Sequence, residues 1–298
     1  MSRVKELEEK AIARLKIFEP SADMEPYYLA YSGGKDSDTI LILAELAGVR
    51  YEAVHNLTTA DAPETVYYVR SKPNVRIDRP EKSMWQLIPQ KLIPPTRLIR
   101  YCCSELKERG GKGRRVVTGV RLAESVTRAK NGGLVKLLDY SKKVIQKAQE
   151  LNVDLEINGK GGIILNNDND DSRELVEHCQ FQSKVLVNPI YDWTDRDVWE
   201  FLTHYGCKSN PLYECGFKRI GCIGCPIASK KRYFEFARYP KYKENYIRAF
   251  DRMLKARAER GLKSKKEWSS AENVFKWWMG EDVNQLSFFD NVFEEENQ

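Results

Sequence analysis

The stretch that decides the fold runs from Tyr27 to Ala47 and reads YYLAYSGGKDSDTILILAELA. Its first residues, Tyr27–Tyr31, form a short apolar run typical of a buried strand. Thr39–Ala47 has the composition of a helix, and Gly48 is a natural end for it. Between the two lies SGGKDS, residues 32–37. A strand, a glycine turn and a helix in direct succession predict the first unit of an α/β sheet.

Strands and helices alternate on both sides of this unit. Apolar residues from Val4 to Phe18 recur at spacings of three and four, which predicts an amphipathic helix. Leu134–Leu151 also has helical periodicity. The remaining predicted elements are strands over Val49–Asn56, Val75–Ile77, Arg115–Val120 and Val185–Ile190, and helices that begin near Asp61 and Thr194. This alternation predicts an α/β, Rossmann-like parallel sheet flanked by helices, with a helical C-terminal region.

The composition is that of an ordered globular protein. The 298 residues are 42% hydrophobic and 11% aromatic, which excludes a disordered chain. No apolar run approaches the roughly 20 residues of a membrane span, and the N-terminal pattern is not that of a signal peptide. We therefore expect no membrane association and a cytoplasmic location.

Near residue 206 the sequence changes from alternating strands and helices to cysteine loops and then basic helices. We therefore expect domains over 1–205 and 206–298.

The residues of SGGKDS suit phosphate binding. Gly33 and Gly34 let the backbone approach an anion, and the following helix offers free N–H groups. Lys35 adds positive charge, the hydroxyls of Ser32 and Ser37 can bond phosphate oxygens, and Asp36 is the natural partner of Mg²⁺. The spacing is not that of a Walker A loop. A plain capping turn remains the alternative.

The seven cysteines suggest a metal site rather than disulfides. Cys222 and Cys225 form a C-x-x-C unit, whose two sulfurs can turn toward one metal. Further thiolates are available from Cys102, Cys103 and Cys215. Four thiolates suit zinc and an iron–sulfur cluster alike. Cys179 and Cys207 lie outside this pattern, and we interpret them as small buried hydrophobes.

Three motifs resemble those of a known family. SGGKDS looks like the SGGxDS signature of the ATP-pyrophosphatase superfamily. Thr118–Ser125, TGVRLAES, followed by Arg128, resembles the TGxRxxES motif of the phosphoadenosine phosphosulfate (PAPS) reductase branch. Asn188–Trp199, NPIYDWTDRDVW, resembles a further element of that branch. The resemblance covers residues 27 to 225.

The resemblance implies an adenine nucleotide α-hydrolase-like fold and an ATP site. Residues 32–37 and Gly119 would hold ATP and Mg²⁺, with Lys35 and Asp36 catalytic. Arg121 and Arg128 would face the phosphates or an anionic acceptor. The family also favours a [4Fe–4S] cluster, built from Cys102, Cys103, Cys222 and Cys225, over Zn²⁺. A set of Cys103, Cys215, Cys222 and Cys225 competes with it.

Two departures separate the chain from thiol-dependent sulfonucleotide reductases. Those enzymes use a nucleophilic cysteine in an ECG(I/L)H-type tail, and here no cysteine follows Cys225. Their phosphate loop is degenerate, whereas SGGKDS is complete. The combination resembles Dnd-type ATPases of DNA phosphorothioation, cluster-bearing tRNA thiolases and small CysH-like proteins. It implies adenylation of an acceptor followed by sulfur insertion, with a sulfur donor such as a cysteine desulfurase. The alternatives are sulfonucleotide reduction, sulfate activation, or a non-catalytic accessory subunit of a defence or mobile-element complex.

Charge is distributed unevenly along the chain. Residues 226–266 carry 14 Lys or Arg against 4 acids, and residues 267–298 carry one Lys against 8 acids. Tyr239, Tyr242, Tyr246 and Phe250 recur at helical spacing and predict a buried face. The opposite face, with Lys241, Lys243, Arg248, Arg252 and Lys255, is either a nucleic-acid surface or a solvated cationic face.

Gln285–Phe289, QLSFF, looks like a bacterial sliding-clamp-binding motif. It would dock as a short linear anchor or else pack back on the protein. The role of residues 131–180, lid or part of the fold, stays open.

Overall fold

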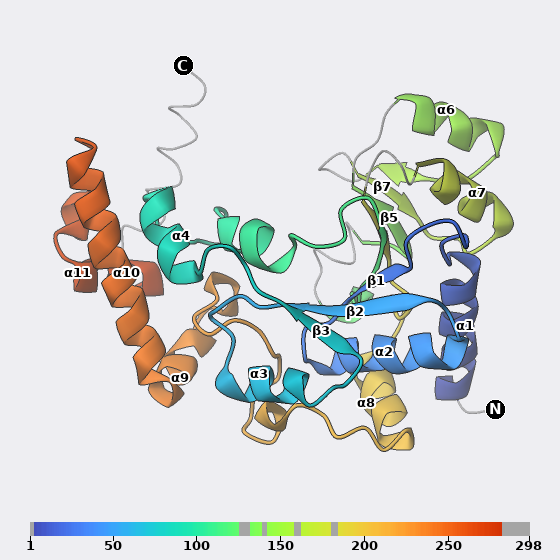
Figure 1. The fold of residues 1–298 in the computed structure, drawn as a ribbon, viewed down its shortest axis with the longest axis horizontal. Helices are drawn as coiled ribbons and strands as arrows, with labels where there is room; N and C mark the ends of the chain where they lie inside the picture. The colour runs from blue at the N-terminus through green and yellow to red at the C-terminus, as the bar shows by residue number, and fades with distance from the viewer. Residues whose placement is uncertain (1–2, 125–131, 139–141, 158–161, 180–183, 282–298) are drawn as a thin grey trace. The chain divides into compact units, whose positions relative to one another are not determined.

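The computed structural model describes residues 3–124, 132–138, 142–157, 162–179 and 184–281 (Figure 1). It contains two compact units, each built from several segments. Unit 1 comprises Met1–Asn56, Pro63–Asp78 and Arg109–Ile220, and unit 2 comprises Leu57–Ala62, Arg79–Glu108 and Gly221–Gln298. This division differs from the expected one at residue 205. The reason is that α4 (Met84–Lys91), early in the sequence, packs against α10 (Pro240–Glu259).

Unit 1 contains an eight-stranded sheet of order β3-β2-β1-β4-β8-β5-β7-β6. One part is parallel and the other antiparallel, so the predicted α/β class is confirmed with a mixed sheet. The parallel strands are β1 (Tyr27–Ala30), β2 (Tyr51–Asn56), β3 (Val75–Asp78), β4 (Arg115–Val117) and β8 (Val185–Val187). The antiparallel strands are β5 (Val135–Leu137), β6 (Glu156–Ile157) and β7 (Ile163–Leu165).

The helix predicted over Leu134–Leu151 is wrong in its first part. Val135–Leu137 forms strand β5, and the helix α6 covers Lys142–Glu150. Periodicity alone cannot separate a short apolar strand from a turn of helix. Pairing with β8 and β7 decides it, because both neighbours are antiparallel partners of β5. The described part of residues 131–180 thus extends the sheet.

Helices cover the sheet of unit 1. They are α1 (Arg3–Ile17), α2 (Lys35–Ala47), α3 (Pro63–Arg70), α6, α7 (Asp170–Cys179) and α8 (Asp195–His204). α2 packs against both α1 and α8, and Leu15, Leu29 and Phe201 belong to one large core cluster. Tyr28, Val54 and Val116 form a smaller cluster of their own. Side chains of successive strand residues point to opposite faces, which explains why Tyr28 and Leu29 lie in different clusters.

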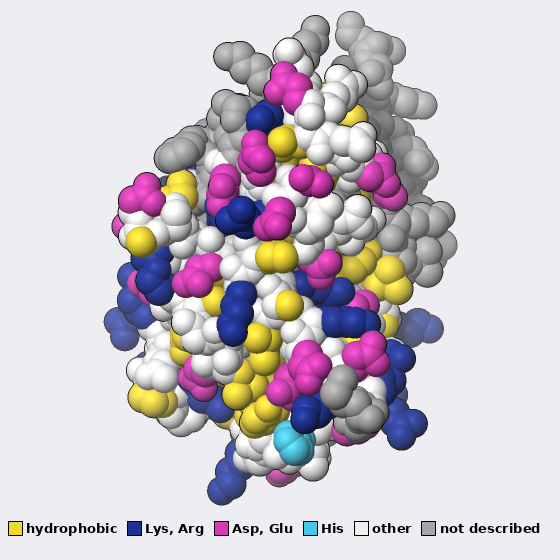
Figure 2. All heavy atoms as spheres, turned by 90° about the vertical axis from the view of Figure 1, so that its right-hand side faces the viewer, with side chains coloured by type: hydrophobic (Ala, Val, Ile, Leu, Met, Phe, Trp, Pro, Cys, Tyr) yellow, Lys and Arg dark blue, Asp and Glu magenta, His cyan; other side chains and the backbone are white. Residues whose placement is uncertain are grey.

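Charges of both signs are interspersed on the described face of unit 1 that Figure 2 shows. Two of the ion pairs of unit 1 are Arg14 with Asp192, at 2.7 Å, and Lys147 with Glu174, at 3.2 Å. Such mixed charge is typical of a solvated surface.

Unit 2 is helical and has an aromatic core. Its helices are α4, α9 (Lys231–Arg238), α10 and α11 (Ala271–Met279). Tyr246 and Phe250 on α10 are buried and contact the ring of Trp278, which confirms the predicted buried face at these two positions. Tyr242 is half-buried and donates its hydroxyl to the carbonyl of Asp61.

Part of the basic face of α10 serves the fold of unit 2 itself. Arg252 donates to the carbonyl of Trp85 at 3.0 Å, and Arg257 donates to that of Leu92 at 2.9 Å. Lys255 pairs with Asp251 at 2.8 Å. No helix among the described residues is long and apolar enough to cross a membrane.

A capping box fixes the start of α8, and one of its residues also forms an ion pair with α1. The hydroxyl of Thr194 accepts from the backbone N–H of Asp197, and the carboxylate of Asp197 accepts from the N–H of Thr194. Arg3 adds a 3.0 Å ion pair to the same carboxylate. Burial alone would raise the pKa of Asp197, but these hydrogen bonds lower it to about 2. The carboxylate is therefore stabilising while it is charged.

We predict that Asp197→Asn lowers the free energy of unfolding by about 1–2 kcal/mol at pH 7, the usual effect of a lost cap. Since the folded pKa lies below the unfolded value of about 4, this contribution is present above pH 4 and is lost as the pH falls toward 2. Urea titrations at pH 7 and pH 3 check this. Asp170→Asn, at an exposed ion pair with Arg173, is the matched control and should change little. An equal effect of Asp197→Asn at both pH values would contradict the assignment.

Candidate functional site

The loop of residues 32–37 joins β1 directly to α2, as predicted (Figure 1). Gly33 has φ +75°, and a Cβ there would lie 3.0 Å from Val69 and 3.1 Å from Thr65. Only glycine fits this turn without strain. The amide of Asn210 donates to the carbonyl of Gly33 at 2.9 Å and to the hydroxyl of Thr65 at 3.2 Å. The loop is thus held from outside as well as by its own geometry.

Several hydroxyl and N–H groups of the loop have partners within unit 1. The Ser37 hydroxyl accepts from the Gly34 N–H at 3.0 Å and donates to the Gly34 carbonyl at 2.7 Å. It lies 3.3 Å from the Ser32 hydroxyl. The Lys35 N–H donates to the hydroxyl of Tyr213 at 2.8 Å. Ser37 therefore caps the helix in this structure, although its position beside Ser32 also suits an oxyanion.

Two cations and two carboxylates meet at the start of α2. Arg121 is 1% exposed and binds Asp36 through Nε at 2.8 Å. Its Nη2 binds Oδ1 of Asp195 at 2.5 Å. Lys35, also buried, has its Nζ 3.1 Å from Asp36 and 3.3 Å from the same Asp195 oxygen. We call these four residues the charge cluster. Burial acts to raise the pKa of Asp195, but hydrogen bonds and charges from Arg121 and Lys35 outweigh it and lower that pKa.

Gly119 explains how Arg121 reaches the loop. A Cβ on Gly119 would lie 2.9 Å from both the Cβ and the carbonyl oxygen of Asp36. Only a residue without a side chain allows the segment after β4 to come this close to α2. Asp36 and Arg121 can then form their ion pair.

A buried carboxylate lies beneath the loop. Asp38 is 1% exposed and accepts hydrogen bonds from the hydroxyls of Tyr31, at 2.5 Å, and Tyr68, at 2.9 Å. Burial raises the pKa of Asp38 to about 6, partly offset by the two tyrosine hydroxyls and by Lys72. Asp38 faces tyrosines rather than the charge cluster, so it supports the first turn of α2.

The structure brings most of the predicted phosphate-site residues together: Ser32, Gly33, Gly34, Lys35, Asp36, Ser37, Gly119 and Arg121. Arg128 lies outside the described residues. The sequence interpretation missed Asp195, Tyr213 and Asn210. Asp195 follows a predicted cap at Thr194, which marks a helix start but not a contact with Lys35. Two buried cations beside a helix N-terminus can bind a polyphosphate, and Asp36 can bind a divalent cation.

Four of the five candidate metal ligands belong to unit 2, and Cys215 belongs to unit 1. The pKa of Cys102 is raised by a hydrogen bond with Cys103, by burial and by the charges of Cys103, Cys222 and Cys225. The charges of Cys222 and Cys225 thus act on Cys102 from within the same unit. Arg100 donates to the Cys103 sulfur at 3.2 Å, and Cys222 lies 3.3 Å from the Thr58 hydroxyl.

As placed in the described parts of the chain, no group of three or more His, Cys, Asp or Glu side chains is arranged to hold a metal ion. Cys207 is half-buried and packs against the core of unit 1, in line with its interpretation as a hydrophobe. Nothing is described of the side chain of Cys179.

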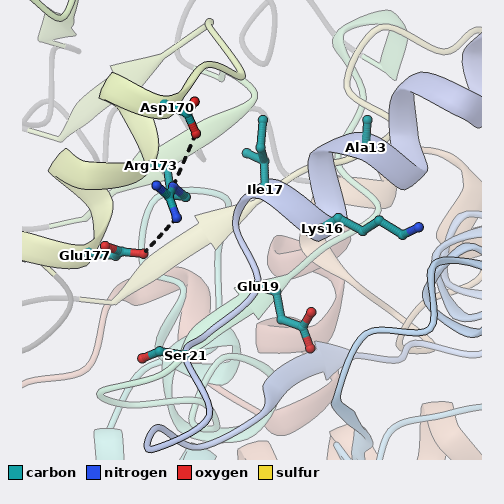
Figure 3. A pocket seen from close by; sticks show the side chains of 8 residues that line it. All are labelled: Ala13, Lys16, Ile17, Glu19, Ser21, Asp170, Arg173 and Glu177. Atoms are coloured by element: carbon teal, nitrogen blue, oxygen red, sulfur yellow. Dashed lines mark ion pairs between the residues drawn. The ribbon is translucent and has the colours of Figure 1, made fainter.

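A surface hollow of about 580 Å³ lies elsewhere in unit 1. Its lining comes from the end of α1 and from α7, and Figure 3 shows Arg173 between Asp170 and Glu177. None of the phosphate-loop residues lines this hollow. Its lining carries two cations, Lys16 and Arg173, against the three carboxylates of Glu19, Asp170 and Glu177, so the charge cluster at the start of α2 is the better candidate for anion binding.

We predict that Gly119→Ala destabilises unit 1 by about 1–3 kcal/mol, because the added methyl group meets backbone atoms that cannot move aside. Urea denaturation measures the loss. Gly221→Ala is the matched control, since a Cβ there meets no atom within 4 Å. Equal stability of the two variants would refute the close approach of Gly119 to Asp36.

Comparisons with known proteins cover most of the chain. Residues 26–228 match the family model described as the phosphoadenosine phosphosulfate reductase domain. An uncharacterized protein of Methanocaldococcus jannaschii is 27% identical over 265 residues, which cover 85% of this chain and 53% of that protein. A phosphoadenosine 5'-phosphosulfate reductase of Xylella fastidiosa is 43% identical over 44 residues, 15% of this chain and 19% of that protein.

Among solved structures, the phosphoadenylyl-sulfate reductase of Candida auris is similar with a TM-score of 0.41 at 16% identity. The match covers 74% of this chain and 96% of that one. The chain spans about half the length of the archaeal relative and less of the reductase. With a family model that covers β1, the phosphate loop, β4 and β8, the chain belongs to the phosphoadenosine phosphosulfate reductase domain family.

Proposed function

We propose that the chain is an ATP-pyrophosphatase that binds ATP with Mg²⁺ at residues 32–37 and transfers AMP to an acceptor. The observation that carries this proposal is the charge cluster. Lys35 and Arg121 are two buried cations at the N-terminus of α2, where a polyphosphate would also meet the N–H groups of the first turn of the helix. The complete SGGKDS loop suits an intact triphosphate.

Each residue has a defined task in the proposed reaction. The loop N–H groups and Lys35 hold the β- and γ-phosphates, and Asp36 holds Mg²⁺ against them. Arg121 stabilises charge on the phosphates as the acceptor oxygen attacks the α-phosphorus. The bond from the α-phosphorus to its bridging oxygen breaks, and pyrophosphate leaves. Arg128, outside the described residues, would add a second guanidinium.

The proposed acceptor is a nucleic acid. Sulfide, released by a thiol reductant from the persulfide of a donor such as a cysteine desulfurase, then displaces AMP from the adenylated acceptor. The basic stretch 226–266 supports this choice, although Arg252 and Arg257 also bind carbonyls of unit 2. Gln285–Phe289, the proposed sliding-clamp anchor, lies outside the described residues. A second candidate is sulfonucleotide reduction or sulfate activation, which the similarity to reductases favours. A non-catalytic accessory subunit is the third.

We further propose that Cys102, Cys103, Cys222 and Cys225 hold a [4Fe–4S] cluster, with Zn²⁺ as the alternative. Their place in one unit, and the effect of Cys103, Cys222 and Cys225 on the pKa of Cys102, support this set over one that includes Cys215 of unit 1. Such a cluster would supply either structural support or a site for sulfide.

Wild-type protein is expected to catalyse ATP–pyrophosphate exchange when the right acceptor is present, and Asp36→Ala to abolish it. The physical reason is loss of the Mg²⁺ ligand and of the Arg121 partner. The assay uses anaerobically purified protein with DNA, RNA, sulfate or no acceptor, and circular dichroism confirms that the variant folds.

Asp168→Asn, which removes an exposed partner of Arg14, is the control and should exchange like wild type. Exchange only with sulfate would favour the second candidate. ATP binding without exchange on any acceptor would favour the third, and turnover by Asp36→Ala would refute the loop assignment.

Metal analysis tests the thiol set. Anaerobically purified protein should contain iron and acid-labile sulfide, and Cys225→Ser should lose most of both, because a cluster needs its thiolates. Cys207→Ser is the matched control and should keep them, as should Cys215→Ser. Zinc in place of iron would select the alternative metal, and full retention by Cys225→Ser would contradict the set.

A further inference from the structure

Three donors at the phosphate loop, from Lys35 and Arg121, face oxygen atoms of the protein itself. The Lys35 N–H, at the start of α2, donates to the hydroxyl of Tyr213 at 2.8 Å. The side chains of Lys35 and Arg121 share a single oxygen, Oδ1 of Asp195, at 3.3 Å and 2.5 Å. A phosphate group would seek the same three donors.

Asp195 differs from the two cations of the charge cluster in exposure. The side chains of Lys35 and Arg121 are 8% and 1% exposed, whereas that of Asp195 is 73% exposed. The cations are therefore fixed in the protein, and the carboxylate reaches them from the solvent side. Moving Asp195 away leaves it in water, where a carboxylate is well solvated.

Asp195 and Tyr213 are also linked to each other through one element. Asp195 is the first residue of α8, and Trp199 lies one turn further along the same helix. The ring of Trp199 contacts the ring of Tyr213 edge to face, with centroids 4.9 Å apart. A shift of the start of α8 would therefore affect both oxygens together.

If the Asp195 carboxylate and the Tyr213 hydroxyl both moved away and nothing replaced them, Asp36 would be the one anionic partner left to Lys35 and Arg121 within the charge cluster. Two buried cations and one carboxylate carry a net positive charge, which is costly in a buried site. An incoming phosphate restores the balance. When phosphate replaces the Asp195 carboxylate directly, Lys35 and Arg121 keep an anionic partner throughout.

We propose that Asp195, assisted by Tyr213, is an internal counter-ion that occupies the anion position of the phosphate loop and is displaced when phosphate binds. This inference rests on the proposed function and deepens it, since it identifies what the polyphosphate must replace. Asp195 is a positioning residue that sets the affinity of the site by competition. Its removal should therefore tighten the binding of phosphate, whereas removal of a residue that holds the cations in place for phosphate would weaken it.

The test is calorimetric titration of the full chain with inorganic pyrophosphate and Mg²⁺ at low ionic strength. We expect Asp195→Asn to bind pyrophosphate about fivefold more tightly, or better, because the competing negative charge is gone. The gain should shrink as salt is raised, since added anions take over the competition. Tyr213→Phe removes the hydroxyl that accepts from the Lys35 N–H and keeps the ring against Trp199. It should also tighten pyrophosphate binding, and it provides the test if Asp195→Asn does not fold.

Asp192→Asn is the matched control. It removes the same charge from the turn before α8, but its partner is Arg14, at 2.7 Å, so its affinity should equal that of wild type. Equal tightening by Asp192→Asn would indicate a general charge effect and overturn the proposal. Unchanged or weaker binding by both Asp195→Asn and Tyr213→Phe would also overturn it and leave the proposed function standing. Absence of pyrophosphate and ATP binding by the wild type would instead remove the proposed function itself.

Discussion

Parallel pairing of β1 with β4, and of β4 with β8, is the constraint on which the candidate site depends. Parallel strands end at the same edge of a sheet, so the segments that follow them meet there. The segment after β1 carries Lys35 and Asp36, that after β4 carries Gly119 and Arg121, and that after β8 leads to Asp195. A strand order that moved β1, β4 and β8 apart would separate the members of the charge cluster.

Pairing of opposite charges then stabilises the residues at that edge of the sheet. Lys35 and Arg121 are buried, and buried charges persist only with partners of opposite sign. Asp36 and Asp195 balance them in this structure. The proposed displacement of Asp195 by an anion follows from the same pairing, because an exposed carboxylate is easier to replace than a buried one. Asp38 contributes differently, since its two tyrosine partners hold the first turn of α2 from below.

Unit 2 depends on packing more than on charge. Its thiols come from two distant parts of the sequence, and α4 and the following segment belong with the C-terminal helices. The aromatic contacts of Tyr246, Phe250 and Trp278 hold α10 and α11 together. Arg252 and Arg257 add hydrogen bonds to carbonyls at Trp85 and Leu92, so part of the positive charge of this region is used internally.

The sequence by itself determined the α/β class and the strand–loop–helix at residues 27–47, because hydrophobic periodicity and glycine turns are local signals. It determined the buried face of α10 for the same reason. Only the tertiary structure decided that Val135–Leu137 is a strand, since pairing with β8 and β7 supplies its hydrogen bonds. Only the tertiary structure placed Asp195 and Tyr213 at the loop and Cys215 outside unit 2. These are contacts between residues far apart in the sequence, and no local pattern of residues encodes them.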